Sequence, residues 1–286
     1  MEKQIAVIGG DLRIAILAEL LAKDDWKVLS YGFEKYSFQE TSIQKIETLE
    51  KIGEQTECFF SSVPFSKDGI RIKAPFASKE IYFEEVFPKI KRGTFFAGAL
   101  KEDWIQKYQD KITFVDLMEE ECLTIQNAVS TVEGAIQKIM EETDRTIYQS
   151  KILILGFGRI GKLLANRLHS FGAQIYCEAR KQTDLTWIQA YGYHPIPLAE
   201  LKNCNLTQFD IAINTIPHLV LGEEEIQQLN PNCFVIDLAS APGGVDREAI
   251  QKRKIHFQWA LALPGEVAPV SSAEFLKQAF DQVRMK

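Results

Sequence analysis

Short apolar runs alternate with stretches of helical periodicity along the chain of 286 residues. In the first half, an apolar run at residues 4–10 ends in two glycines, and in residues 12–23 the apolar positions recur at the spacing of a helix face. Further apolar runs lie at residues 26–33, 57–65, 81–87, 93–98 and 112–117. Because strands that alternate with helices are typical of parallel sheets, this half predicts a small open α/β sheet that ends near Glu120.

The second half repeats this pattern after one long helical stretch. From Thr124 to about Thr146 the apolar residues recur at helical spacing, and a strand-like run follows at residues 151–157. Four more apolar runs lie at residues 173–180, 209–216, 233–239 and 254–261. Residues 271–285 have the pattern of an amphipathic helix, and the two serines that open them suit an N-cap. We therefore expect an α/β protein with a second open parallel sheet.

The order of these segments and the length of the chain both predict two domains. We expect a substrate-side α/β domain at residues 1–123, a linking helix at 124–148, a Rossmann dinucleotide-binding domain at 149–268 and a C-terminal helix at 269–286. No segment rich in proline, glycine or serine separates them. We therefore expect helices to join the two domains, with a cleft between them.

Composition and charge narrow the function. The chain is 46% hydrophobic and 25% charged, and its net charge of −6 without a basic stripe argues against nucleic acid as a partner. The sequence contains neither roughly eighteen consecutive apolar residues nor a signal-like N-terminus, so we expect no membrane contact. The five cysteines and four histidines are scattered and form no metal-binding pattern. We expect a cytoplasmic protein without a metal.

A glycine-rich turn follows the first strand of the second half. Gly156, Gly158 and Gly161 form the pattern G-x-G-x-x-G, with Arg159 and Ile160 between the last two glycines. In a dinucleotide-binding unit the first glycine permits a tight turn, the second lets the pyrophosphate approach the backbone, and the third lets the helix pack closely on the strand. The N–H groups that begin the helix face the anion. The turn predicts a dinucleotide site; a sharp turn without a ligand is the alternative.

The residues after the next strand indicate which dinucleotide binds. Enzymes that use NAD carry an acidic residue there, about twenty residues beyond the glycines, which binds the ribose 2′-hydroxyl. In this chain the position is Ala179, followed by Arg180 and Lys181, and two cations without a carboxylate suit a 2′-phosphate. Glu178 comes one residue earlier, so its side chain should point to the other face of the strand. NADP is favoured, and NAD is the alternative if the register shifts by one residue.

Turns after the later strands complete the expected cofactor site, because ligands of open α/β sheets bind beyond the carboxyl ends of the strands. A Thr-Ile-Pro-His turn follows the third strand of this half, and an Ala-Ser-Ala-Pro-Gly-Gly turn follows the fourth. We expect cofactor contacts from Asn214, Thr215, Ile216, Pro217 and Ser240. Asp237, at the end of the fourth strand, is a candidate hydrogen-bond acceptor for its turn. The alternative is that all of these only form turns.

Two side chains are candidates for acid–base catalysis. His218 follows the proline turn, and histidine is a common acid–base residue in enzymes, although this one could instead cap a helix. Glu133 lies on the long helix beside Gly134, a glycine that should weaken the helix by about 1 kcal/mol relative to alanine. This cost suggests close backbone approach or a ligand near Thr131 and Glu133. A capping box of Ser130 and Glu133 is the alternative.

The first strand of the chain also ends in a glycine turn, with the sequence IGGD. Arg13 follows this turn and can meet a carboxylate group through charge-assisted hydrogen bonds. The turn lacks the full glycine pattern. We therefore expect it to bind the substrate and not a second dinucleotide.

Six motifs in this order, IAVIGGDLR, STVEGAI, LGFGRIG, INTIP, DLASAPGG and LPGEVAP, resemble those of the family of dipicolinate synthase A subunits. The resemblance covers essentially the whole chain. It implies the NADP-dependent conversion of dihydrodipicolinate to dipicolinate in a spore-forming bacterium, and a partner, the flavoprotein-like B subunit of dipicolinate synthase. It also implies an architecture like that of 2-hydroxyacid and alanine dehydrogenases, with the C-terminal helix returning to the first domain.

The resemblance also implies roles for single residues. Gly156, Gly158, Gly161 and Arg180 would bind the cofactor. The residues that would line the cleft are Thr131, Glu133, Ser240, Gly243, Gly265 and Pro269. The chain departs from the family pattern at Ser130, where proline is usual, and at Glu178, where glycine is usual.

The substrate that the resemblance implies is a dicarboxylate, which becomes aromatic by losing a hydride and a proton. The protein therefore has to orient the substrate against the nicotinamide and accept the proton. Arg13 and backbone N–H groups near Ser240 could bind the carboxylates, and Glu133 or His218 could take the proton. The alternatives are an NADP-dependent dehydrogenase of another small carboxylic acid, or a regulatory subunit that binds a dinucleotide without catalysis. For its assembly, a homo-oligomer is a further alternative.

Overall fold

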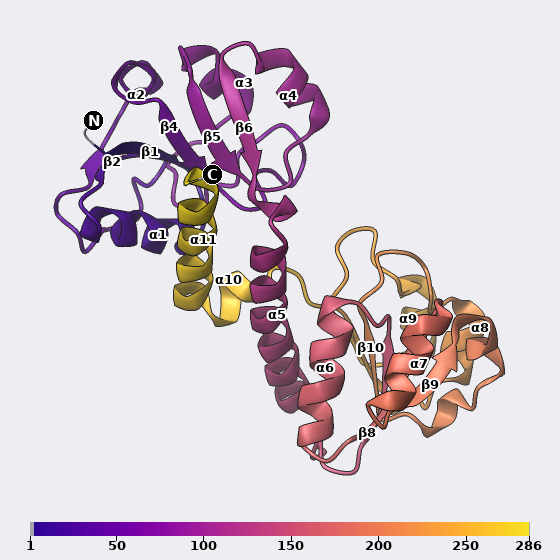
Figure 1. Cartoon of the computed structure of the whole chain (residues 1–286). Helices are drawn as coiled ribbons and strands as arrows, with labels where there is room; N and C mark the ends of the chain where they lie inside the picture. The colour runs from indigo at the N-terminus through magenta and orange to yellow at the C-terminus, as the bar shows by residue number, and fades with distance from the viewer. Residues whose placement is uncertain (1–2, 286) are drawn as a thin grey trace. The chain divides into compact units, whose positions relative to one another are not determined.

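The computed structural model describes residues 3–285. The chain divides into two compact units: the first runs up to Asn127 and takes in the segment from Ala268 onward, and the second is Ala128–Val267. Each unit is built around its own sheet (Figure 1). None of the helices between residues 3 and 285 combines the length and the apolar character that a membrane span requires.

The sheet of the first unit has six parallel strands in the order β3-β2-β1-β4-β5-β6. The strands are β1 (Gln4–Ile8), β2 (Lys27–Tyr31), β3 (Gln44–Lys45), β4 (Cys58–Ser61), β5 (Gly93–Ala97) and β6 (Ile112–Asp116). The central strands β1, β2 and β4 are buried almost throughout, as expected when helices cover both faces of a parallel sheet.

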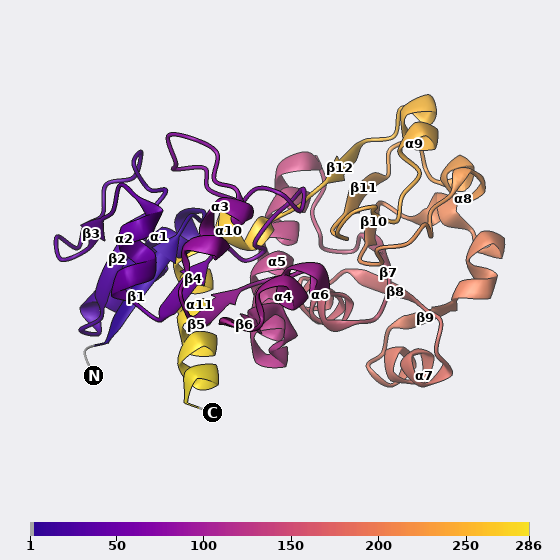
Figure 2. The same cartoon turned by 90° about the horizontal axis from the view of Figure 1, so that it is seen from above.

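Two long helices cover one face of this sheet. They are α1 (Leu12–Lys23) and α11 (Pro269–Arg284), which lie side by side (Figure 1, Figure 2). The ring of Phe280 on α11 lies 4.8 Å, centre to centre, from the ring of Phe96 on β5. The end of the chain thus completes the core of the first unit. Three shorter helices cover the other face: α2 (Leu49–Gln55), α3 (Phe83–Val86) and α4 (Glu102–Tyr108).

The sheet of the second unit also has six parallel strands, in the order β12-β11-β10-β7-β8-β9. The strands are β7 (Lys151–Leu155), β8 (Gln174–Ala179), β9 (His194–Pro197), β10 (Ile211–Asn214), β11 (Phe234–Asp237) and β12 (Phe257–Trp259). Counted along each unit, both sheets have the order third, second, first, fourth, fifth, sixth. This is the order of doubly wound dinucleotide-binding folds, so the predicted α/β class with two open parallel sheets is confirmed.

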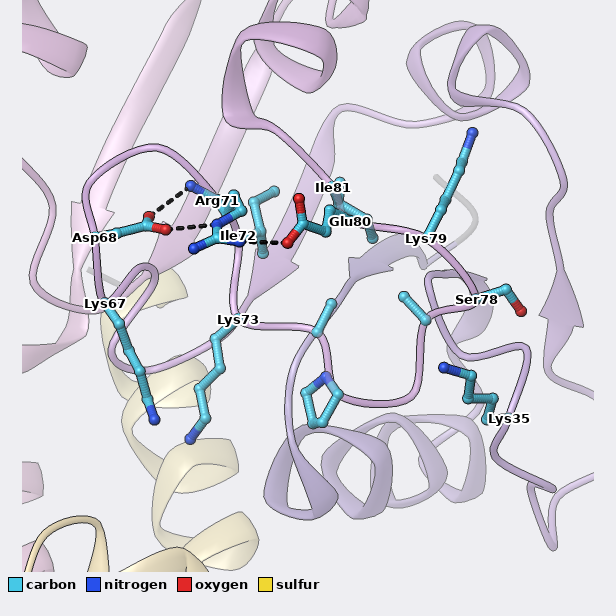
Figure 3. Close-up of a pocket in the computed structure, with 13 residues that line it drawn as sticks. Lys35, Lys67, Asp68, Arg71, Ile72, Lys73, Ser78, Lys79, Glu80 and Ile81 are labelled. Carbon is cyan, nitrogen blue, oxygen red and sulfur yellow. Dashed lines mark hydrogen bonds and ion pairs between the residues drawn. The ribbon is translucent and has the colours of Figure 1, made fainter.

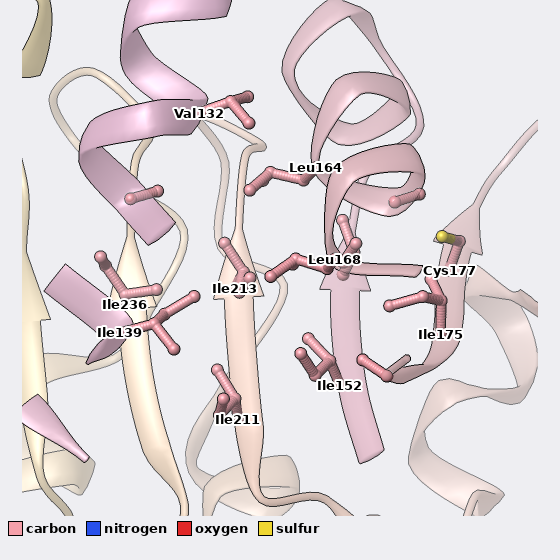
Figure 4. Close-up of a cluster of buried hydrophobic side chains, with 14 of the residues drawn as sticks. Val132, Ile139, Ile152, Leu164, Leu168, Ile175, Cys177, Ile211, Ile213 and Ile236 are labelled. Atoms are coloured by element: carbon pink, nitrogen blue, oxygen red, sulfur yellow. The ribbon is translucent and has the colours of Figure 1, made fainter. Parts of the chain in front are cut away.

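Helices also cover both faces of the second sheet. One face packs against α5 (Glu121–Glu142), α6 (Arg159–Ser170) and α7 (Gln182–Ala190), and the other against α8 (Glu223–Gln228) and α9 (Arg247–Arg253). Figure 4 shows the first of these cores, in which Leu164 and Leu168 of α6 point toward the strands and Leu168 lies near Ile152 of β7. Its neighbour Leu153 is buried in the other core. Burial on both faces explains why these strands have apolar runs instead of alternating polar residues.

The least predictable segments are the short ones. The predicted strand at residues 81–87 is wrong: it forms α3 and a 3-10 turn, which bury Phe83, Val86 and Phe87. Their spacing of three and four residues suits a helix, but an apolar run this short does not distinguish the two structures. The strands β3 and β9 were not predicted because one has two polar residues and the other has two prolines.

The C-terminal region contains two helices. The LPGEVAP motif after the last strand contains a short helix, α10 (Leu263–Val267). The next helix, α11, begins at Pro269 and not at the serines, because proline suits a first helical position, where its missing N–H is not needed. Ser272 lies buried inside α11, so the serines do not cap it.

Candidate functional site

Two glycines of the turn between β7 and α6 are required by the fold. Gly156 has a φ of +93°, which favours glycine, and a side chain there would come within 2.6 Å of the Thr215 hydroxyl oxygen. A side chain at Gly161 would come within 2.0 Å of the Gly156 carbonyl oxygen. The first glycine therefore permits the turn and the third permits the close approach of α6 to β7.

Gly158 has a different reason to be glycine. Its backbone is extended, with a φ of −83°, and a side chain there would meet no atom within 4 Å. Packing in this chain therefore does not exclude a side chain at this position. Gly158 is the N-cap of α6 and no side chain caps the helix there, so the first N–H groups of α6 are available to an anion. The turn thus fits a dinucleotide pyrophosphate, which Gly158, Arg159 and Ile160 would meet.

The turn after β10 is held against the glycine turn. The Thr215 hydroxyl donates to the Leu155 carbonyl at 2.8 Å, and the Ile216 side chain would crowd any side chain at Gly156. Asn214 is fully buried, and its amide nitrogen donates to the Ile216 carbonyl at 2.9 Å. Asn214 therefore uses its side chain to shape the turn, while Thr215 and Ile216 remain half-buried and Pro217 is exposed.

Asp237 joins this turn to the turn after β11. Its buried carboxylate accepts the amide of Asn214 at 2.7 Å and the backbone N–H groups of Ala239 at 3.0 Å and Gly244 at 2.8 Å. Ser240 is exposed on this turn. Because β7, β10 and β11 are neighbours in one sheet, the three turns lie at the same edge, and Asp237 has the structural role that the sequence suggested.

Glu178 lies closer to the glycine turn than the sequence predicted. It pairs with Leu155 across the sheet, and it is only 1% exposed. Its carboxylate accepts the backbone N–H of Gly156 at 3.1 Å. Burial raises the pKa of this carboxyl group, while the Gly156 hydrogen bond and the charge of Arg180 act in the opposite direction. Ala179 ends β8 with its side chain in the core beside α6, and Arg180 follows, exposed.

The two candidate bases both lie in the second unit. Glu133 is exposed on α5, and its carboxylate is 3.4 Å from the guanidinium group of Arg167. His218 is exposed, and it caps no helix, because the next helix has Gly222 as its N-cap. Among the residues that the structure describes, no group of three or more histidines, cysteines or acids could hold a metal ion.

Gly134 on α5 is explained by packing. A side chain there would meet the Leu263 side chain at 3.1 Å and that of Val267 at 3.2 Å, both from α10. The close approach that the sequence suggested is therefore made by a helix. Ser130 is buried in the interior of α5, which excludes the capping box with Glu133. Thr131 is half-buried on α5, and Gly243 is buried beside Asp237 while Gly265 is half-buried in α10.

In the first unit, Arg13 is part of a charged network at the end of β1. It is buried, and its Nε and Nη2 atoms donate to the carboxylate of Asp11, the N-cap of α1. Nη2 also donates to the Val63 carbonyl at 2.6 Å, so two of the three guanidinium nitrogens are used internally. Lys73 lies 2.5 Å from the same carboxylate. Burial opposes ionisation of Asp11, but Arg13 and Lys73 outweigh it and lower its pKa to about 2.

Sequence reasoning missed Asp11 and Lys73. The N-cap role of Asp11 was visible in principle, since an aspartate precedes a helical pattern. Lys73 comes 62 residues later in a loop, and no local pattern marks it.

Two families of known domains match the chain, one for each half. Residues 4–118 match the N-terminal domain of the A subunit of dipicolinate synthase. Residues 120–254 match the NAD-binding domain of D-isomer specific 2-hydroxyacid dehydrogenases. The second match and the glycine turn make this half a nicotinamide dinucleotide-binding domain of the oxidoreductase type.

Known proteins also match over nearly all of the chain. The A subunit of dipicolinate synthase from Bacillus subtilis strain 168 is 28% identical over 283 residues, which cover 98% of this chain and 95% of that protein. The crystal structure of the same protein from Bacillus halodurans matches with a TM-score of 0.89 at 27% identity, covering 99% and 98% of the two chains. An L-alanine dehydrogenase, at a TM-score of 0.62 and 12% identity, shares the fold alone. The chain is therefore a relative of the dipicolinate synthase A subunits over its whole length.

Proposed function

We propose that this chain is the oxidoreductase subunit of a dipicolinate synthase, which converts dihydrodipicolinate to dipicolinate with NADP during sporulation. The observation that carries the proposal is the pairing of the two matches: a domain typical of dipicolinate synthase precedes a nicotinamide-binding domain in one chain. The glycine turn supports it, because Gly158 leaves open the side from which a pyrophosphate would approach.

The reaction removes a hydride and a proton from the dihydropyridine ring, which becomes aromatic. When bound, the nicotinamide ring would supply the acceptor for the hydride. The residues proposed to hold the cofactor are Gly156, Gly158, Arg159, Ile160, Gly161, Thr215, Ile216, Pro217 and Ser240. Asn214 is proposed to act indirectly, because its buried side chain bonds to the backbone of Ile216 and so fixes the turn of Thr215 and Ile216.

We propose NADP as the cofactor because the last residue of β8 is not acidic, and an acidic side chain there would repel a 2′-phosphate. Ala179 ends the strand, and the exposed Arg180 and Lys181 follow it. Glu178 comes directly before Ala179, and its carboxylate is buried against the Gly156 N–H. An exposed guanidinium group can donate two hydrogen bonds to a phosphate, which favours NADP over NAD.

Acceptance of the proton is proposed for Glu133 or His218, which are both exposed in the second unit. The Glu133 carboxylate offers oxygens that can accept a proton, and it lies 3.4 Å from the guanidinium group of Arg167. In the first unit, we propose that Arg13 meets a carboxylate of the substrate. In the second unit, we propose substrate contacts for the backbone near Ser240 and Gly243, and for Thr131 and Gly265.

A reconstituted reaction tests the proposal. Purified chain is combined with dihydrodipicolinate synthase, its substrates and either NADP or NAD, with and without the flavoprotein-like B subunit, and dipicolinate is measured by chromatography. We expect dipicolinate with NADP, and more of it when the B subunit is present. Absence of dipicolinate in every combination would reject the function. Product only with NAD would reject the cofactor alone.

A further inference from the structure

A cavity of about 530 Å³ opens in the first unit. Its wall is formed by Lys35 and by residues 67–68, 71–75 and 77–81 of the connection between β4 and α3 (Figure 3). The volume is in the range of pockets that bind small ligands. The backbone N–H of Gly10 donates to the Lys73 carbonyl at 2.8 Å, so the wall is fixed to the end of β1. The strand order reverses between β1 and β4, and doubly wound sheets bind their ligands at this point.

The side chains that line the cavity give it a positive charge. Five are cationic and two are acidic. Both acids, Asp68 and Glu80, bond to Arg71. Three lysines of the wall form no ion pair with any described residue: Lys35, Lys67 and Lys79. A cavity with this balance attracts anions.

Lys67 and Lys73 are the cations best placed to act together. Figure 3 shows their side chains extending side by side in the same direction. The Lys73 side chain is 18% exposed, and its ammonium group lies 2.5 Å from the Asp11 carboxylate, which Arg13 also binds. Two cations, Arg13 and Lys73, therefore share the single negative charge of Asp11, which leaves one positive charge. Lys67, which lines the same cavity, adds a second, and two positive charges match a small dianion.

We infer that Lys67 and Lys73 bind a carboxylate group of a small dicarboxylate, with Asp11 and Arg13 holding Lys73 in position. The identity of this dicarboxylate as the substrate rests on the proposed function; the site itself rests on the cavity and its charges. The remaining guanidinium nitrogen of Arg13, Nη1, has no hydrogen-bond partner among the described residues. Lys67 and Lys73 thus provide ammonium groups on the cavity wall, and Arg13 provides a third donor at the end of β1.

Direct binding tests this site without relying on turnover. Dipicolinate is titrated into the full chain, in the presence of NADP, and the heat of binding gives the dissociation constant. Lys67→Met and Lys73→Met should each weaken binding about tenfold or more, because each removes one charge-assisted hydrogen bond. Lys27→Met is the matched control. Lys27 is exposed at the start of β2, and the cavity lies at the other end of the strands of the same sheet. Lys67→Arg should retain binding.

The outcomes separate the site from the function. If both methionine variants bind dipicolinate as the wild-type chain does, or if the wild-type chain does not bind it, the inference is wrong. Inorganic phosphate or benzoate binding as tightly as dipicolinate would also overturn it, because a dicarboxylate site should prefer two carboxylates. The NADP affinity of both variants should equal that of the wild-type chain. Lys67→Met should also unfold at the wild-type temperature, whereas Lys73→Met loses the ion pair with Asp11 and should unfold at a lower temperature. A different result would separate the two claims. If the methionine variants lose dipicolinate binding but the wild-type chain shows no turnover, the binding site is supported and the proposed function is rejected.

Discussion

Around the glycine turn, single side chains have two distinct tasks. Asn214 and Asp237 are buried, and their hydrogen bonds hold two neighbouring turns together. Arg180 and Ser240 are exposed beside those turns and are available to a ligand. Glu178 belongs to the first group, because its carboxylate is buried and bonded to the backbone of Gly156. The residues that shape the site thus differ from those that would contact the cofactor.

Arg180 should decide the preference for NADP. Replacing Arg180 with alanine removes the donors to a 2′-phosphate, and we expect the affinity for NADP to fall about tenfold. The affinity for NAD, which has no such phosphate, should change little and provides the internal control. Titration of both dinucleotides by intrinsic fluorescence measures the two affinities. An equal loss for both, or no loss for NADP, would contradict this role.

Asp11 should make the stability of the first unit depend on pH. Its pKa is about 2 in the folded chain, below the usual 3.8, so its ionised form stabilises the folded state above about pH 4, and this stabilisation is lost as the pH falls from about 4 to about 2. Asp11→Asn should therefore lower the free energy of unfolding by about 2 kcal/mol near pH 7. Urea unfolding measures the difference, which should shrink in acid. A difference that stays constant from about pH 7 to about pH 3 would contradict the ion pairs as its cause.

At the scale of elements, the β7–α6–β8 motif contains glycines that are required for two different reasons. Gly161 is required for packing, while Gly158 leaves open space. We expect Gly158→Ala to fold with nearly wild-type stability but to bind dinucleotides about tenfold more weakly, because the methyl group occupies the approach of the pyrophosphate. Gly161→Ala should instead lower the stability by several kcal/mol, since its Cβ would overlap the Gly156 carbonyl oxygen.

Thermal unfolding and dinucleotide titration of these two variants form a matched pair. If Gly158→Ala binds as tightly as the wild-type chain, the glycine turn does not hold the pyrophosphate. If Gly161→Ala is as stable as the wild-type chain, the close approach of α6 to β7 is not tight enough to require glycine.

The elements with strong periodicity could be predicted from the sequence, and the contacts between distant segments could not. The unit of β7, α6 and β8 was visible because an apolar strand, three glycines and a helix follow one another directly. The pairing of Lys73 with Asp11 was not, because it joins a loop to a helix start 62 residues away. Glu178 was expected on the other face of its strand, but alternation alone could not predict that its carboxylate would reach the Gly156 N–H.

At the scale of the whole molecule, one chain contains two sheets with the same strand order. The residues at the carboxyl ends of their strands differ. The second sheet has a full glycine pattern and exposed cations after β8, as suits a dinucleotide. The first has a shorter glycine turn and a charged network of Asp11, Arg13 and Lys73, as suits a small anion. Under the proposed function, the turn that opens the first helix of the second sheet serves the dinucleotide, and the corresponding turn of the first sheet serves the substrate.

The most direct test of the proposed function is the stoichiometry of the reconstituted reaction. Reduced NADP is measured by its absorbance and dipicolinate by chromatography, with this chain, the B subunit of dipicolinate synthase and dihydrodipicolinate supplied together. If this chain catalyses the hydride transfer, reduced NADP and dipicolinate form in equal amounts, and neither forms when the chain is omitted. Dipicolinate formed without reduced NADP, or at the same rate without this chain, would contradict the account.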